Sequence, residues 1–156
     1  MKPTVADVMT RQVECARPEM TIREAAAKMK QRDIGSLPVC DGRKLVGIVT
    51  DRDITLRATA EGINPNLTNV SEIMTRDIVS VRPEDPLEEA ERLMHDCQVR
   101  RLPVVDERGE LAGYLALAGV VRCESPRQAG RVLQGVSQRY APEPMVRGPG
   151  GRRPRP

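Results

Sequence analysis

The chain has 156 residues, a net charge of +3 and 39% hydrophobic residues, with no tryptophan or phenylalanine. No apolar run approaches the roughly 18 residues that span a bilayer, and no signal peptide is recognised, so we expect a cytoplasmic protein that does not contact a membrane. Residues 142–156 hold four arginines and one glutamate and carry the whole net charge, so nucleic-acid binding is a disfavoured hypothesis that only this tail supports.

The first predicted elements are a short amphipathic stretch over residues 5–9 and an extended segment over residues 13–15. A helix follows, because Thr21 and Glu24 have the spacing of a capping box and an apolar stripe begins at Ile22. The remaining elements are two strands joined by Asp41-Gly42, over residues 34–40 and 45–50, and a second helix from about Asp51.

The same order returns 65 residues later. Residues 5–11 return as 70–76, and Leu37-Pro38-Val39 returns as Leu102-Pro103-Val104. In this second copy residues 78–81 are the predicted extended segment, and Asp85, Pro86 and Glu88 predict a helix start with a capping box. The predicted order is therefore strand, helix, strand, strand, helix, twice, and a tandem pair of this kind buries a shared face with clefts along its pseudo-twofold axis.

These patterns predict an α+β fold, a tandem repeat around a pseudo-twofold axis with an added C-terminal helix. The expected divisions are a first repeat over residues 1–61, a linker over 62–69, a second repeat over 70–124, a helix over 125–141 and a disordered basic tail over 142–156. The apolar stripe of the last helix, which includes Val132, Leu133 and Val136, covers either a neighbouring copy or its own sheet.

The strand-to-helix turn after Gly47 is the strongest candidate for chemistry. Its glycine allows close backbone approach, the Thr50 hydroxyl could donate to a phosphate oxygen, and the Asp53 carboxylate could accept two hydrogen bonds from a ribose diol. The same spacing fits a helix cap in which the two side chains satisfy N–H groups of their own turn. Both interpretations stay open.

The doubled pattern, with its Leu-Pro-Val strand and its Gly-h-h-Thr-x-x-Asp turn (h, hydrophobic), resembles the cystathionine-β-synthase (CBS) domain. Two copies in tandem look like a CBS pair, or Bateman module, over about residues 5–122. Within that family the chain resembles small stand-alone actinobacterial members such as the mycobacterial hypoxic-response protein.

The resemblance implies an adenosyl ligand, such as AMP, ADP or ATP, between the two copies, and association into a homodimer. Carried onto this sequence, it implies a ligand-binding set made of Ile48, Thr50, Asp53, Ile78, Val79, Val99, Arg100 and Arg101. Two arginines opposite the turn suit a phosphate chain. The alternative for Arg100 and Arg101 is a pair of solvated surface cations.

The opposite cleft departs from this pattern. Its turn reads Ala116-Leu117-Ala118-Gly119, without hydroxyl or carboxylate, and it faces Gly35 and Ser36, so we expect at most one occupied site per chain. No cofactor is required, and no arrangement of nucleophile and base predicts an enzyme. The lone His95 lies two residues from Cys97 and so on another helix face, which predicts no metal site.

Two hypotheses follow from the sequence. The first is a regulatory module that binds an adenine nucleotide and signals to a separate, unidentified protein partner. The second is a nucleotide-free structural or redox-responsive interaction protein. It relies on Cys15 and Cys40, which end neighbouring predicted strands and form a candidate disulfide or redox pair. The simpler interpretation is that all four cysteines are buried thiols.

Overall fold

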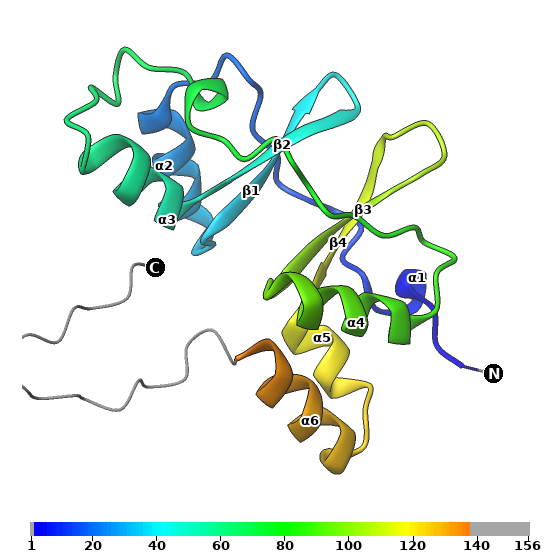
Figure 1. Cartoon of the computed structure of the whole chain (residues 1–156). Coiled ribbons are helices and arrows are strands. Elements are labelled where there is room, and N and C mark those ends of the chain that lie inside the picture. Colours follow the sequence, from blue (N-terminus) through cyan, green and yellow to red (C-terminus); the bar gives the residue numbers. More distant parts are fainter. Residues whose placement is uncertain (1, 138–156) are drawn as a thin grey trace, which may run out of the picture.

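The computed structural model describes residues 2–137 and shows two similar lobes side by side, each a two-stranded hairpin with helices packed beside it (Figure 1). The first lobe contains α2 (Ile22–Arg32), β1 (Ser36–Asp41), β2 (Lys44–Thr50), α3 (Asp51–Asp53) and the π-helical η1 (Ile54–Thr59). The second lobe contains α4 (Leu87–Cys97), β3 (Arg101–Val105), β4 (Leu111–Ala116), α5 (Leu117–Arg122) and α6 (Pro126–Val136). The predicted α+β tandem repeat is confirmed.

Both hairpins are antiparallel and have matching registers. Pro38 of β1 lies opposite Ile48 of β2, and Pro103 of β3 lies opposite Tyr114 of β4. Each hairpin has a β-bulge shortly after the proline of its first strand. The bulges lie between Val39 and Cys40 and between Val104 and Val105. Ile48 and Tyr114 are therefore equivalent positions in the two lobes.

The predicted opening strands of the repeats are wrong. Residues 13–15 and 78–81 form no strand, and each region makes a single parallel bridge, Ala16 to Val39 and Val81 to Val104. Prolines explain this limit. To extend the bridge at Ala16 into a parallel ladder, Pro38 and Pro18 would have to donate hydrogen bonds, but proline has no backbone N–H group. Pro103 and Pro83 limit the bridge at Val81 in the same way.

The opening helix of each repeat packs in the other lobe. Val5, in α1 (Val5–Val8), belongs to the core of the second lobe, whereas Val70, in the 3₁₀-helical η2 (Val70–Glu72), belongs to the core of the first. A methyl group on Gly47 would lie 2.5 Å from the Met74 sulfur. The glycine of the turn therefore accommodates Met74 from the second repeat, where the sequence suggested a close ligand approach.

The two long helices begin differently. At α2 the predicted capping box is confirmed: Thr21 Oγ1 accepts from the Glu24 N–H at 3.1 Å, and a Glu24 carboxylate oxygen accepts from the Thr21 N–H at 2.8 Å. At α4 the predicted box is wrong. Asp85 accepts from the Arg82 N–H instead, and the Leu87 N–H donates to the carbonyl of Pro3, so backbone from the N-terminal segment satisfies this helix start.

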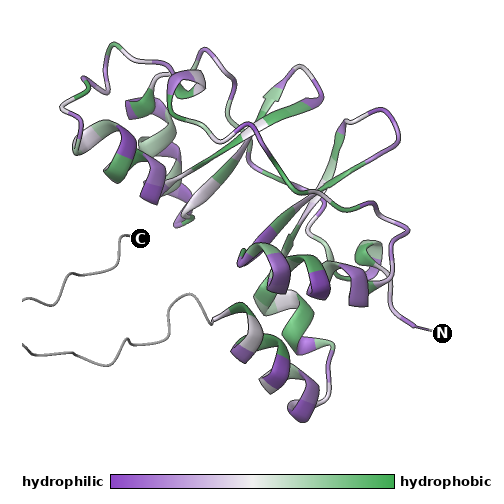
Figure 2. Cartoon of the chain, in the orientation of Figure 1, coloured by the Kyte–Doolittle hydropathy of each residue, from purple (hydrophilic) through white to green (hydrophobic). Residues whose placement is uncertain are grey.

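The C-terminal helix α6 packs on α4 and α5 of its own chain, and not on a sheet. Ser125 caps it, Pro126 takes its first position, and Val132 and Val136 are buried in the core of the second lobe. Figure 2 shows apolar residues concentrated on α5 and the strands, with hydrophilic residues on α4 and α6. The predicted end of this helix at residue 141 and the predicted tail over residues 142–156 lie outside the described residues.

Candidate cavity between the two repeats

A cavity of about 680 Å³ opens between the two lobes. The first lobe lines it with the start of β1, with β2 and with the turn after β2. The second lobe lines it with the end of α4, the start of β3 and Tyr114 of β4, and residues 75–79, which follow η2, complete the wall. All eight residues implied by the family resemblance line it: Ile48, Thr50, Asp53, Ile78, Val79, Val99, Arg100 and Arg101. Residues distant in sequence are thus brought together at one site.

Thr50 and Asp53 cap the helix that follows them, as the alternative interpretation predicted. Thr50 Oγ1 accepts from the Asp53 N–H at 3.0 Å, and Asp53 Oδ2 accepts from the Thr50 N–H at 3.0 Å. The second carboxylate oxygen, Oδ1, lies 3.8 Å from Nε of Arg57. Capping uses one lone pair of the hydroxyl and one carboxylate oxygen, so both side chains keep polar capacity on the cavity wall.

The charges on the wall are balanced. Arg52, Arg100 and Arg101 supply three guanidinium groups, and Asp51, Asp53 and Asp77 supply three carboxylates. Arg100 and Arg101 are both exposed, and they line the cavity from the second lobe. A cavity with separate cationic and anionic groups suits a ligand that carries an anion and hydrogen-bond donors on the same molecule.

The sequence interpretation missed Tyr114, whose ring also lines the cavity. The hydroxyl groups of Tyr114 and Ser36 are 3.0 Å apart, so this hydrogen bond joins β4 of the second lobe to β1 of the first. Burial raises the pKa of Tyr114, and the bond to Ser36 and the charge of Arg101 act in the opposite direction. Tyr114 occupies the position in the second repeat that Ile48 occupies in the first, and this alignment could have identified it as a cavity residue.

The two predicted clefts are not separate at this point. Gly35 and Ser36, which were expected to face the second turn, line the same cavity as Thr50 and Asp53. The second turn begins α5 and serves packing: Leu117 is buried in the core, and a methyl group on Gly119 would meet Val8 of α1 at 3.2 Å. In this turn the Leu117 side chain serves the core, whereas Ala118 is exposed.

Cys15 and Cys40 lie together, as their predicted positions implied. The Ala16 N–H donates to the Pro38 carbonyl and the Cys40 N–H donates to the Ala16 carbonyl, which places the two thiols in contact as free cysteines. A hydrogen bond from the Cys40 thiol lowers the pKa of Cys15 to about 7, with help from the charge of Lys28, and the same bond raises the pKa of Cys40. The contact thus favours the thiolate of Cys15 over that of Cys40, while burial opposes it.

Within residues 2–137 no group of three or more histidine, cysteine, aspartate or glutamate side chains is arranged to hold a metal ion. In the same range no helix combines the length and apolar character needed to cross a bilayer.

Comparisons with known proteins agree with this geometry. The family model "CBS domain" matches residues 5–58 and 70–124. The CBS domain-containing protein YhcV of Bacillus subtilis is 44% identical over 135 residues, 86% of this chain and 95% of its own. The crystal structure of Hypoxic Response Protein I with two coordinated zinc ions has a TM-score of 0.72 at 35% identity, covering 78% of this chain and 99% of that one. CBSX2 in complex with AMP has a TM-score of 0.68 at 33% identity, covering 77% and 94%.

Proposed function

The chain belongs to the CBS-domain family as a tandem pair, and from this premise we propose that it is a regulatory module that binds an adenine nucleotide or a related adenosyl ligand between its repeats. The observation that carries the proposal is the convergence of all eight implied residues on one cavity. The proposed role is sensing without catalysis, with the signal passed to a separate protein partner.

The polar groups of the cavity suit the three parts of such a ligand. The Thr50 hydroxyl proton is available to a phosphate oxygen, while the Asp53 carboxylate, whose side chain is only 14% exposed, offers Oδ1 to a ribose diol. Arg100 and Arg101 lie across the cavity, where charge-assisted bonds to phosphate are favourable. Ile48, Ile78 and Val79 supply an apolar wall for a base.

A structural neighbour supports this ligand class. CBSX2, which is 33% identical over the shared region, was crystallised with AMP. We extend that ligand to this chain because both lobes supply polar groups to its cavity. The cavity joins the two lobes, so a ligand that prefers one lobe packing over another would shift the equilibrium between them by its difference in affinity. A homodimer is the proposed assembly through which a partner would detect this shift.

Thermal unfolding and calorimetry with AMP, ADP, ATP and S-adenosylmethionine test the proposal. A ligand present at one hundred times its Kd should stabilise the fold by about 2.7 kcal/mol. The Asp53→Ala variant should lose this shift. Because Asp53 also caps its helix, the variant should in addition lose about 1 kcal/mol of stability without ligand.

Glu24→Ala is the matched control. It removes the equivalent carboxylate from the α2 capping box, at a distance from the cavity lining. Its basal stability should fall as in Asp53→Ala, but its response to ligand should match that of the original chain. Absence of binding heat with all four compounds would refute the proposed function, and equal ligand responses in the two variants would refute the assigned role of Asp53.

The contact between Cys15 and Cys40 favours the second candidate, a redox-responsive interaction protein. A thiolate next to a second thiol is the arrangement from which a disulfide forms on oxidation. Mass spectrometry after mild oxidation should find a Cys15–Cys40 disulfide, and Cys15→Ser should abolish the accompanying change in melting temperature. Four free thiols after oxidation would exclude this candidate.

A further inference from the structure

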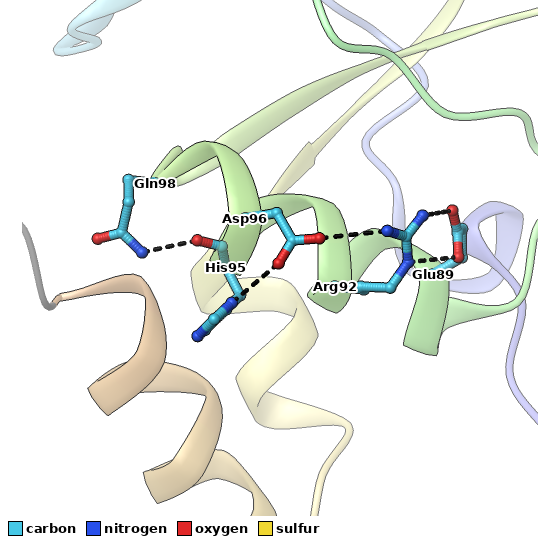
Figure 3. Close-up of polar contacts among 5 residues, drawn as sticks. All are labelled: Glu89, Arg92, His95, Asp96 and Gln98. Atoms are coloured by element: carbon cyan, nitrogen blue, oxygen red, sulfur yellow. Dashed lines mark hydrogen bonds and ion pairs between the residues drawn. The ribbon is translucent and has the colours of Figure 1, made fainter.

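Helix α6 is held on the second lobe by contacts with no equivalent in the first. Figure 3 shows His95 and Gln98, at the end of α4, directed toward α6. The Gln98 side-chain amide donates to the carbonyl of Gly135 at 2.8 Å, and a methyl group on Gly135 would lie 2.5 Å from the His95 ring. The apolar contribution comes from Val132 and Val136, which join the core.

The polar residues of α4 at this junction are specific to the second repeat. Glu91, His95 and Gln98 correspond to Ala26, Lys30 and Asp33 in the first repeat, which has no packed additional helix. Of these three differences between the repeats, a glutamate at position 91 where the first repeat has Ala26 is the least expected, because the position is buried. The Glu91 carboxyl contacts α6 through Gln128, in a repeat that has this additional helix.

Glu91 is a buried carboxyl with incomplete hydrogen bonding. The residue is only 9% exposed, and its Oε1 has no hydrogen-bond partner within residues 2–137. Its Oε2 lies 3.5 Å from the side-chain amide nitrogen of Gln128 on α6. The carboxyl of Glu124, between α5 and α6, also contacts it. Two ionised carboxylates in contact would repel each other, whereas a shared proton makes the contact favourable.

We propose that α6 is a proton-controlled clamp, docked on α4 and α5 when the protonated carboxyl of Glu91 donates a hydrogen bond to the carboxylate of Glu124, and loosened when both carboxyls are ionised. The proton is released to solvent in the loosened state. In the docked state the side-chain amide of Gln128 also donates to Glu91 Oε2, at 3.5 Å.

The charges around Glu91 act in the direction that this clamp needs. Burial raises the pKa of Glu91 to about 7, with further increases from Glu124 and Glu88 and an opposing effect of Gln128. Glu88 is itself paired with Lys2 at 2.9 Å. The other charged side chains of α5 and α6, Arg122, Arg127 and Arg131, are exposed. His95 and the Glu89–Arg92–Asp96 ion pairs lie along the exposed part of α4 (Figure 3).

The direction of the pH effect follows from this pKa. In the loosened state the carboxyl of Glu91 has the ordinary glutamate pKa of 4.5, so it releases near that pH the proton that the docked state retains. Docking is therefore strongest at or below that pH, weakens as pH rises through about 7, and is constant above it. Because one pKa unit corresponds to a factor of ten, the docking equilibrium should change at least about tenfold across this window.

Hydrogen exchange of the full chain tests the clamp. Amide protection factors of residues 128–137, corrected for intrinsic exchange, should fall about tenfold between pH 5.5 and pH 8.5, while those of α2 stay constant. In Glu91→Gln the neutral amide donates to Glu124 at every pH, so protection of α6 should stay high at both. Glu61→Gln, an exposed carboxyl of the first repeat, is the control and should behave as the original chain.

Two more variants keep the test decisive. Glu124→Gln should also give pH-independent protection, since its amide can donate to Glu91, and it replaces Glu91→Gln if that variant fails to fold. Gly135→Ala should detach α6 through the contact with His95 and give low protection at both pH values. Constant α6 protection in the original chain, or an unchanged pH response in both glutamine variants, would overturn the proposal.

Discussion

Gly47→Ala separates two reasons for the glycine in the strand-to-helix turn. The added methyl group would lie 2.5 Å from the Met74 sulfur, 3.0 Å from its Cγ and 3.1 Å from the carbonyl oxygen of Thr75. The methionine side chain can shift, but the carbonyl is held by the paired hydrogen bonds between Ile48 and Thr75, at 3.0 and 2.8 Å. Part of the clash must therefore persist.

The expected loss of stability follows from these contacts. Overpacking a well-packed site costs about 1–3 kcal/mol, and replacing a glycine within a strand returns about 0.5–1 kcal/mol. The midpoints of these ranges give a net destabilisation of about 1 kcal/mol for Gly47→Ala, which for a chain of this size lowers Tm by roughly 2–4 °C.

A double-mutant cycle with Met74→Ala provides the assay. Met74 is buried, so its truncation alone should cost about 2–5 kcal/mol. In the double variant the new methyl group occupies space that the methionine leaves, so the total loss should be smaller than the sum by at least about 1 kcal/mol. Urea denaturation measures all four free energies of unfolding.

Additive effects, or a Gly47→Ala variant as stable as the original chain, would refute this reasoning. A variant of unchanged stability that fails to bind an adenosyl ligand would instead show that the glycine permits close approach of the ligand.

Three more outcomes are expected. Arg101→Gln should weaken AMP about tenfold or more in calorimetry, with little effect on adenosine, because charge-assisted bonds to phosphate are worth about 1.5–3 kcal/mol; equal losses would contradict the assignment. Iodoacetamide should label Cys15 at a rate that rises with pH through about 7, because its thiolate forms there, and peptide mass spectrometry measures this rate. A midpoint of the rate profile at the pKa of an ordinary thiol would contradict this prediction. Gly130→Ala, with no atom within 4 Å of the added methyl group, should stabilise α6 by about 0.5–1 kcal/mol in thermal unfolding.

The repeat made the site predictable. Ile48, Thr50 and Asp53 stand at one copy's turn and Val99, Arg100 and Arg101 precede the other copy's Leu-Pro-Val strand, so the family resemblance implied that they meet, and they line one cavity. Tyr114 was missed although it aligns with Ile48. Its contact with Ser36 joins two strands that no local pattern relates.

The local sequence pattern also predicted an opening strand in each repeat that the structure does not contain. Residues 13–15 and 78–81 have suitable side chains, but a ladder depends on N–H groups in the partner, and Pro38 and Pro103 supply none. These prolines were visible in the sequence, yet their effect depends on which strand pairs with which.

The sequence by itself determined the repeat, the two hairpins and the capped start of α2, because periodicity, turn residues and capping pairs act over a few residues. Only the tertiary structure decided that the opening helix of each repeat packs in the other lobe, that Thr50 and Asp53 both cap a helix and line a cavity, and that α6 covers α4 beside a buried Glu91. These outcomes depend on contacts between distant segments, and burial of a shared core selects among the partners that local pattern leaves open.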